Sequence, residues 1–250
     1  MENIVLDHIQ NLRDLSGSTD KIRQNRILRG PCLDRMSEQD IHVLRDICHL
    51  STVIDLRTNK ERSERPDHII PGVRYLHLPI FEDRIPGISH EKGHNDPAHF
   101  DMAYFYRQTI TGEFLDRVRE VVRTIITLPE EGYAVLYHCT EGKDRTGIIT
   151  AILMMIMGED KKTIVTDYLY TNHVNEPKAE RYYQMVLEKT GDIRQAEGIR
   201  DAFMARERYI QAFFDGIDED WGSIDTFLQE GLLLSEGELE YFRDKVCHEQ

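Results

Sequence analysis

Short apolar runs alternate with stretches of helical periodicity along the first 150 residues. The runs at residues 25–29, 52–57, 74–80 and 134–139 are rich in β-branched and apolar residues, as buried strands are. Stretches long enough for a helix separate them along the chain. Strands joined in this way favour a parallel sheet that is covered by helices on both faces.

Two helices between these strands are predicted from their end signals. Ser37 stands three residues before Asp40, a capping-box pattern that starts a helix, and apolar residues follow it at helical spacing. A second amphipathic helix has an apolar face from Phe114 to Leu128 and ends at Pro129.

The chain after residue 145 is predicted to be helical to its end. Residues 146–158, TGIITAILMMIMG, are apolar almost all round, which is typical of a helix buried on every side. A periodic face follows at 199–214, a helix starts near Ser223, and a capping box at Ser235 starts the last one. We therefore expect an α/β fold with a central, mainly parallel sheet flanked by helices and a helical C-terminal half.

The chain has no internal repeat, low-complexity tract or linker that would divide it. We therefore expect a single domain over residues 1–250. Its least regular stretch is 82–112, which mixes Pro, Gly, His and Asp before the aromatic-rich MAYFYRQTI. A long excursion of this kind inside a compact domain is typical of a functional lid.

Composition narrows the class of protein. Hydrophobic residues make up 40% of the chain, enough for a core without disulfides, and the four cysteines have no C-x-x-C or zinc-ribbon spacing. The N-terminus is broken by charges, and no stretch approaches the roughly 18 apolar residues of a membrane span. We expect a cytoplasmic protein with no cleavable signal peptide and no integral membrane segment, although secretion by another route stays open.

The formal net charge of −14 argues against a nucleic-acid partner, because such binding needs clustered Lys and Arg. An anionic substrate must be attracted locally, so a tight group of cations would be informative in this chain.

The segment LYHCTEGKDRTGIIT, residues 136–150, passes from a predicted strand through a polar loop into a predicted helix. The backbone N–H groups from Thr140 to Arg145 can turn inward around one point, and such a ring binds a tetrahedral oxyanion such as phosphate or sulfate. The helix N-terminus adds partial positive charge there, and a thiol beneath it favours the thiolate. Cys139 is therefore predicted to be a nucleophile at neutral pH.

Other residues of this segment fit the same chemistry. Arg145 offers two parallel N–H donors that match two phosphate oxygens, and Thr146 can donate its hydroxyl to the departing thiolate. Gly142 and Gly147 permit unusual torsions and close helix packing. A cysteine and an arginine at this spacing also arise by chance, but the preceding His138 and the strand–loop–helix context are independent requirements that the sequence meets.

The segment HCTEGKDRTG, residues 138–147, resembles the signature of cysteine-dependent phosphatases. The likeness is to the bacterial tyrosine, dual-specificity and phosphoinositide phosphatases typified by mycobacterial tyrosine phosphatase B and the Listeria lipid phosphatase. Other segments also resemble this family's motifs, so that the likeness covers nearly the whole chain: NLRD at 11–14, DLR at 55–57, DYLYTN at 167–172 and WGSI at 221–224.

The resemblance implies a protein tyrosine phosphatase-like fold and hydrolysis of phosphotyrosine monoesters through a cysteinyl-phosphate. Phosphoserine, phosphothreonine and phosphoinositides are further substrates that it suggests, and it implies no cofactor and no metal. Catalysis falls to Cys139 and Arg145. The remaining loop residues would bind the substrate's phosphate: Thr140, Glu141, Gly142, Lys143, Asp144 and Thr146.

The departing oxygen needs a proton donor, which usually lies on a mobile loop. In the family this acid follows a Leu-Pro segment after the third strand, and LPIFED at 78–83 fills that place here. We predict Asp83 as the acid, because its separation from Asp55 matches the family's spacing. Glu82 is the alternative, and both are otherwise ordinary loop acids.

Lys143 and Asp144 distinguish this loop. A lysine adds a second cation near the bound phosphate, which suits substrates with more than one phosphate, and the family's lipid phosphatase activity suggests the same use. A carboxylate about 4 Å from a phosphate dianion would cost several kcal/mol. Asp144 must therefore pair with Lys143, cap backbone N–H groups, or act in its protonated form as an acid.

Three further groups carry weaker signals. Asp55 and Arg57 end a predicted strand, where α/β sheets gather ligand-binding groups, or they form an ion pair that supports the loop. The His and Asp residues within 90–101 match no metal-site spacing. The aromatic stripe suggests a lid that stacks on a phenyl phosphate. It comprises Phe100, Tyr104 and Phe105.

Two other classes of function also hold an anion in such a loop. A pseudophosphatase would bind phosphate without turnover, but Cys139, Arg145 and a candidate acid are all present. A rhodanese-like sulfurtransferase lacks the Lys-Asp-Arg-Thr-Gly string, and an arsenate reductase needs a resolving thiol that the other cysteines do not obviously supply.

Overall fold

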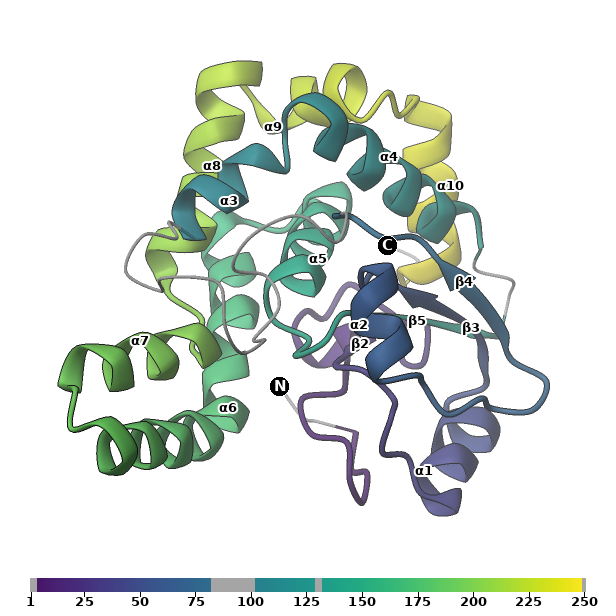
Figure 1. Cartoon of the computed structure of the whole chain (residues 1–250). Coiled ribbons are helices and arrows are strands. Elements are labelled where there is room, and N and C mark those ends of the chain that lie inside the picture. The colour runs from purple at the N-terminus through teal and green to yellow at the C-terminus, as the bar shows by residue number, and fades with distance from the viewer. Residues whose placement is uncertain (1–3, 82–101, 129–131, 249–250) are drawn as a thin grey trace.

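The computed structural model describes residues 4–81, 102–128 and 132–248 (Figure 1). Its centre is a five-stranded sheet in the order β1-β2-β5-β3-β4. The strands are β1 (Arg13–Asp14), β2 (Ile27–Gly30), β3 (Leu50–Asp55), β4 (Arg74–His77) and β5 (Ala134–His138). All neighbours are parallel except β1, a short antiparallel strand at the edge. The α/β fold with a mainly parallel sheet that the sequence predicts is confirmed.

The carboxyl ends of the four parallel strands lie at one level. Gly30 pairs with His138, His138 with Asp55, and Asp55 with His77. The loop that starts at Cys139 therefore leaves the middle of the sheet, between the ends of β2 and β3. Side chains that follow different strands of a parallel sheet meet at this edge.

Helices surround the sheet, and most of their mass lies on one side of it (Figure 1). None of them, within the described ranges, combines the length and the apolar character needed to cross a membrane. Their bounds are α1 (Glu38–His42), α2 (Asn59–Glu64), α3 (Met102–Gln108), α4 (Gly112–Thr127), α5 (Asp144–Ile156), α6 (Lys161–Thr190), α7 (Ile193–Phe203), α8 (Glu207–Trp221), α9 (Ile224–Thr226) and α10 (Glu236–Val246). The predicted capping boxes at Ser37 and Ser235 begin α1 and α10.

Alternating side chains of the strands serve two cores. Ile54 and Tyr137 point into the larger core, which α4, α5, α8 and α10 cover. Val53 and Leu136 point into a smaller core, which the N-terminal segment and α1 complete. Every residue of α5 from residue 145 to 156 is buried. The all-round apolar helix that the sequence predicts is therefore confirmed.

The periodic face at 199–214 is divided between two helices, with a break at residues 204–206. Asn172 explains the break, because its side-chain amide binds both the carbonyl and the N–H of Ala205 at 2.9 and 2.7 Å. Asn175 donates to the carbonyl of Phe203 at 2.9 Å. These side chains satisfy backbone groups that an unbroken helix would pair internally, so hydrophobic periodicity alone could not reveal the break.

The predicted lid at 82–112 is described only from residue 102 onward. Its described part forms α3, which packs against α8. Phe105 is buried, with its ring centroid 4.5 Å from that of Phe81, while Tyr104 is 63% exposed. Phe105 therefore belongs to the core, not to a lid surface. The lid and the single-domain assignment stay predictions.

Candidate active site

The predicted loop residues come together between β5 and α5. Cys139 follows β5, is only 3% exposed, and begins the loop that ends where α5 starts at Asp144. Both flanking strands hold the loop through the backbone. The N–H of Cys32, after β2, donates to the carbonyl of Thr140 at 3.3 Å, and the N–H of Leu56, after β3, donates to that of His138 at 2.9 Å.

The loop carbonyls point outward. The Asn11 amide donates to the carbonyl of Glu141 at 3.1 Å, and Arg29 donates to the carbonyl of Gly142 at 2.9 Å. Since a peptide plane carries its N–H opposite its carbonyl, the following N–H groups face the interior of the loop. In the described part of the chain, the N–H groups of residues 140–146 donate to no acceptor. Buried N–H groups rarely stay unpaired, so this ring is suited to an anion.

A buried ionic network lies behind the loop. Asp167 of α6 pairs with Arg13 at 3.3 Å and with Arg29 at 2.5 Å. Burial alone would raise the pKa of Asp167, but the positive charges of Arg13 and Arg29 lower it to about 2. Arg13 also donates to the side-chain oxygen of Asn11 at 2.6 Å. The segments 11–14 and 167–172 therefore act together to orient the outward carbonyls.

Glycine is the only residue type that the backbone accepts at position 142. Gly142 has a φ of +66°, and a Cβ there would lie 2.6 Å from the carbonyl carbon of Gly30. A side chain would meet backbone, which cannot move aside as a flexible side chain can. The predicted need for glycine at this position thus has two separate causes.

Arg145 forms a two-pronged ion pair with Glu61 of α2. Its Nη1 and Nη2 atoms donate to the two carboxylate oxygens at 2.6 and 2.7 Å, and both side chains are buried. The Nη2 group also lies 3.3 Å from the hydroxyl of Thr140. A guanidinium has five N–H donors, so others remain for a phosphate. The sequence predicts a fork aimed at phosphate, whereas in the structure two donors of that fork bind Glu61.

Charge explains the states of these groups. Burial alone would raise the pKa of Glu61, but hydrogen bonds from Arg145 lower it to about 2. Burial alone would lower the pKa of Arg145, but the hydrogen bonds with Glu61, and then the electrostatic interaction with Cys139, raise it above its ordinary value. The sulfur and the guanidinium therefore lie close enough to interact electrostatically.

Sequence reasoning missed Glu61. One signal was available, because Thr58 and Glu61 form a capping box at the start of α2, directly after the DLR segment. That pattern places a carboxylate in the first turn but does not reveal that Arg145 is its partner.

Thr146 is fully buried, and its hydroxyl has no hydrogen-bond partner among the described residues. An unpaired buried hydroxyl is unfavourable, which is a reason to look for a functional partner. The predicted partner is the sulfur of Cys139, and that assignment stays a prediction.

The side chains of Lys143 and Asp144 bind groups of other helices, not the interior of the loop. The Lys143 ammonium is buried and donates to the carbonyls of Ala202 at 2.6 Å and Met204 at 3.3 Å, at the end of α7. It also pairs with Asp144 at 3.4 Å, one of the three options that the sequence left open. Asp144 accepts a hydrogen bond from Tyr106 at 2.8 Å. Lys143 would have to leave the α7 carbonyls to contact a substrate.

Asp55 and Arg57 form the supporting ion pair that the sequence offered as one alternative. Arg57 donates to Asp55 at 2.8 Å and to Asp67 at 2.9 Å, and His138 lies 3.2 Å from Asp67. Burial alone would lower the pKa of His138, but the Asp67 carboxylate raises it. Ligand atoms of Asp55, Asp67 and His138 lie within 4.8 Å of one another, but both carboxylates already pair with Arg57, and Asp67 also pairs with His138, so we assign no metal here.

The sequence also draws attention to the acids and histidines of 82–101 and to the other cysteines. Asp83, Glu82 and the histidines of 90–101 lie outside the described residues. Burial raises the pKa of Cys32 to about 12 and that of Cys48 to about 11, so neither is an activated thiol of the kind that an arsenate reductase uses.

Comparison with known proteins extends these observations to the whole chain. A family model described as "Tyrosine phosphatase family" matches residues 4–248. A Cupriavidus necator protein that bears a tyrosine-protein phosphatase name is 27% identical over 246 residues, 95% of this chain and 86% of that protein. The triple specificity protein phosphatase PtpB of Mycobacterium tuberculosis is 26% identical over 250 residues, 88% of this chain and 90% of PtpB.

Likeness to solved structures is weaker. The crystal structure of Pseudomonas aeruginosa TpbA has a TM-score of 0.36 and 18% identity, over 72% of this chain and 87% of TpbA. A TpbA variant in complex with phosphotyrosine has a TM-score of 0.34 and 19% identity, over 58% of this chain and 68% of TpbA. Similarity at this level supports no argument about the site.

Proposed function

The chain belongs to the tyrosine phosphatase family and is a phosphoric monoester hydrolase of the protein tyrosine phosphatase class, and on this premise we propose that Cys139 carries out a two-step hydrolysis. One observation carries the proposal. The N–H groups of residues 140–146, which have no acceptor among the described residues, form a ring that follows Cys139 and includes the N–H of Arg145. Such a ring stabilises negative charge that develops on phosphoryl oxygens.

In the first step the Cys139 sulfur attacks phosphorus. The S–P bond forms while the P–O bond to the leaving group breaks, and the leaving oxygen takes a proton from an acid, for which we propose Asp83. The loop N–H groups and Arg145 bind the equatorial oxygens, whose hydrogen bonds strengthen in the transition state.

In the second step water attacks the cysteinyl-phosphate. The S–P bond breaks, the electron pair returns to sulfur, and the carboxylate of Asp83 takes the proton from the water. Thr146 donates its hydroxyl to the departing thiolate, and no other described residue competes for that hydroxyl. Inorganic phosphate then leaves the loop. The scheme uses only groups of this chain and water.

Phosphotyrosine in proteins is the leading substrate. Its phenolate is a good leaving group. Its phosphate stands at the far end of a phenyl ring, so that it can reach the buried Cys139. The printed name of the Mycobacterium tuberculosis relative, a triple specificity phosphatase, is a reason to test phosphoserine, phosphothreonine and phosphoinositides as well.

Steady-state hydrolysis of p-nitrophenyl phosphate and a phosphotyrosine peptide tests the proposal. Cys139→Ser should lower kcat by at least about a thousandfold, because an alcohol is a far weaker nucleophile at neutral pH. Cys48→Ser removes a buried thiol that precedes the start of β3, whereas the loop lies at the other end of that strand, and it should keep kcat. Vanadate binding without any turnover by the wild type would instead indicate a pseudophosphatase. Thiosulfate cyanolysis or arsenate turnover would indicate the thiolate enzymes of other classes.

The proposed acid needs its own experiment, with phosphate esters whose leaving groups differ in pKa. Asp83→Asn should lower kcat most for poor leaving groups, because these depend most on protonation. Glu82→Gln is the matched control, and a larger effect of Glu82→Gln would transfer the role to that residue. Equal losses for good and poor leaving groups would remove both from the role.

A further inference from the structure

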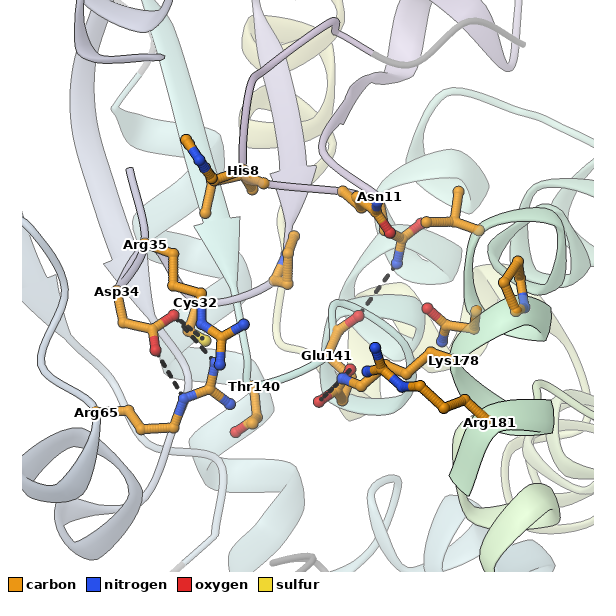
Figure 2. A pocket seen from close by; sticks show the side chains of 16 residues that line it. His8, Asn11, Cys32, Asp34, Arg35, Arg65, Thr140, Glu141, Lys178 and Arg181 are labelled. Carbon is orange, nitrogen blue, oxygen red and sulfur yellow. Dashed lines mark hydrogen bonds and ion pairs between the residues drawn. The ribbon is translucent and has the colours of Figure 1, made fainter. Parts of the chain in front are cut away.

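A cavity of about 380 Å³ lies beside the catalytic loop, with Thr140 and Glu141 in its wall (Figure 2). Basic side chains reach into it from the segment after β2, from the end of α2 and from the middle of α6. Figure 2 shows them as two pairs that face each other across the cavity: Arg35 and Arg65 on one side, Lys178 and Arg181 on the other.

Two of these cations are already paired. Arg65 binds Asp34 through two hydrogen bonds of 2.8 and 3.0 Å. Lys178 binds both carboxylate oxygens of Glu141, at 2.6 and 2.8 Å. These pairs neutralise both carboxylates of the cavity and fix its two walls in place.

The other two cations are not neutralised. In the described part of the chain, no carboxylate lies within ion-pair distance of Arg35 or Arg181. The cavity therefore holds two positive charges more than negative ones, in a chain whose net charge is −14. A local excess of positive charge in a cavity attracts anions, although the protein as a whole is negatively charged.

Thr140 connects this cavity to the catalytic loop. Its side chain lines the cavity, while its hydroxyl lies 3.3 Å from Nη2 of Arg145 and donates to Glu61. An anion in the cavity would thus sit next to the phosphate in the loop. A substrate that carries a second negative group close to its phosphate can reach both at once.

We propose, on the premise of the proposed function, that this cavity binds a second anionic group on a phosphotyrosine peptide, within a few residues of the phosphotyrosine. The group is a carboxylate or a second phosphate, since the planar guanidinium forks of Arg35 and Arg181 match the paired oxygens of both. The two arginines are then specificity-determining residues of the enzyme.

The shape of the surface favours a peptide over a lipid headgroup. The cavity shares Ile9 and Asn11 with a second hollow of about 340 Å³, which Ile4 and Leu6 also line. Two adjoining hollows, one lined by basic and one by apolar side chains, suit a peptide that carries an acidic and an apolar residue. A membrane rich in anionic lipid would repel a protein of net charge −14.

Three phosphotyrosine peptides that differ at one neighbouring position test the proposal: one with Gln, one with Glu and one with phosphoserine. We expect wild-type kcat/KM to be about tenfold higher for the anionic peptides, an advantage that shrinks as salt is raised. The double variant Arg35→Ala/Arg181→Ala should reduce this ratio to about one, and Arg35→Glu/Arg181→Glu should invert it. Arg74→Ala removes an exposed arginine at the opposite end of the sheet and should keep the ratio.

The outcomes separate this inference from the proposed function. Turnover of p-nitrophenyl phosphate with equal kcat/KM for all three peptides would overturn the subsite and leave the function intact. If the wild type has no turnover, the proposed function is wrong. The affinities of the three peptides for the Cys139→Ser variant then test the subsite, and equal affinities would overturn it. A preference for phosphoserine alone assigns the cavity to phosphate. If the arginine changes alter only the ratio between bisphosphorylated and monophosphorylated phosphoinositide vesicles, the ligand is a lipid headgroup and the peptide proposal is wrong.

Discussion

Arg145 of the loop and Glu61 of α2 face each other as two planar groups, joined by hydrogen bonds of 2.6 and 2.7 Å. The pair fixes the guanidinium before any substrate arrives, and a preorganised cation need not be reoriented during the reaction. Glu61 is itself fixed by Thr58, whose capping box belongs to α2. The position of Arg145, the proposed catalytic arginine, thus depends on a helix that follows a different strand.

Glu61→Gln keeps the size of the side chain but removes its charge and one of its two acceptors. The guanidinium then loses its fixed orientation, so we expect kcat/KM for p-nitrophenyl phosphate to fall by about 10- to 100-fold. Glu64→Gln, on the exposed side of the same helix, is the control and should keep the wild-type value. Wild-type kcat/KM in Glu61→Gln would show that the ion pair does not orient Arg145 for catalysis.

Asp167→Asn should destabilise the protein by about 3–5 kcal/mol near neutral pH, because it leaves the buried Arg13 and Arg29 without a counter-charge. Burial raises the pKa of Asp167, but both arginines outweigh it and lower the pKa to about 2. A carboxyl whose pKa is depressed on folding contributes stability above its unfolded value, near 4, and loses it as the pH falls toward 2.

Urea unfolding of both proteins between pH 7 and the lowest pH at which the wild type folds measures this difference. The gap between wild type and Asp167→Asn should be widest above about pH 4 and narrow below it. Asp20→Asn, an exposed position with the same charge change, should show no gap. A gap that stays constant with pH would mean that packing, not charge, accounts for the loss.

Gly142→Ala and Gly191→Ala form a matched pair, because both glycines have a φ of +66°. At Gly191, which ends α6, the added Cβ meets nothing within 4 Å, so only backbone strain of about 1 kcal/mol is expected. At Gly142 the Cβ would lie 2.6 Å from backbone of Gly30, and we expect a further loss of about 2 kcal/mol.

Thermal denaturation and turnover together test this pair. Gly142→Ala should lower both Tm and kcat, since relief of the clash displaces the loop, whereas Gly191→Ala should lower Tm only slightly. Equal effects of the two substitutions on Tm would show that the contact with Gly30 is relieved at no cost.

The sequence predicts the parts of this site that depend on local pattern. The loop from Cys139 to Arg145 and the buried helix after it follow from apolar periodicity, glycine placement and the resemblance to a known signature. The tertiary partners do not follow. Glu61 lies 84 positions from Arg145, and no local pattern relates the two. Similarly, the sequence predicts that Lys143 contacts phosphate, because no local pattern shows that a carbonyl at the end of α7 binds its ammonium.

Thr146→Val tests the second chemical step. Valine keeps the volume and removes a buried hydroxyl that has no partner among the described residues, so stability should be unchanged or slightly higher. Without the hydroxyl the departing thiolate loses a donor, and we expect hydrolysis of the cysteinyl-phosphate to slow by about tenfold or more. Stopped-flow release of p-nitrophenol should then show a burst of one equivalent followed by a slower steady rate.

Thr150→Val, one turn further along α5, has the opposite signature. The Thr150 hydroxyl lies 2.7 Å from that of Tyr137 and donates to the Thr146 carbonyl at 2.8 Å, so its loss should lower Tm by several degrees and leave the two chemical steps in their wild-type ratio. A burst in both variants would indicate a general distortion of α5. Slow steady turnover of Thr146→Val without a burst would place the hydroxyl's effect in the first step, at the attack of the sulfur on phosphorus, and not at its departure.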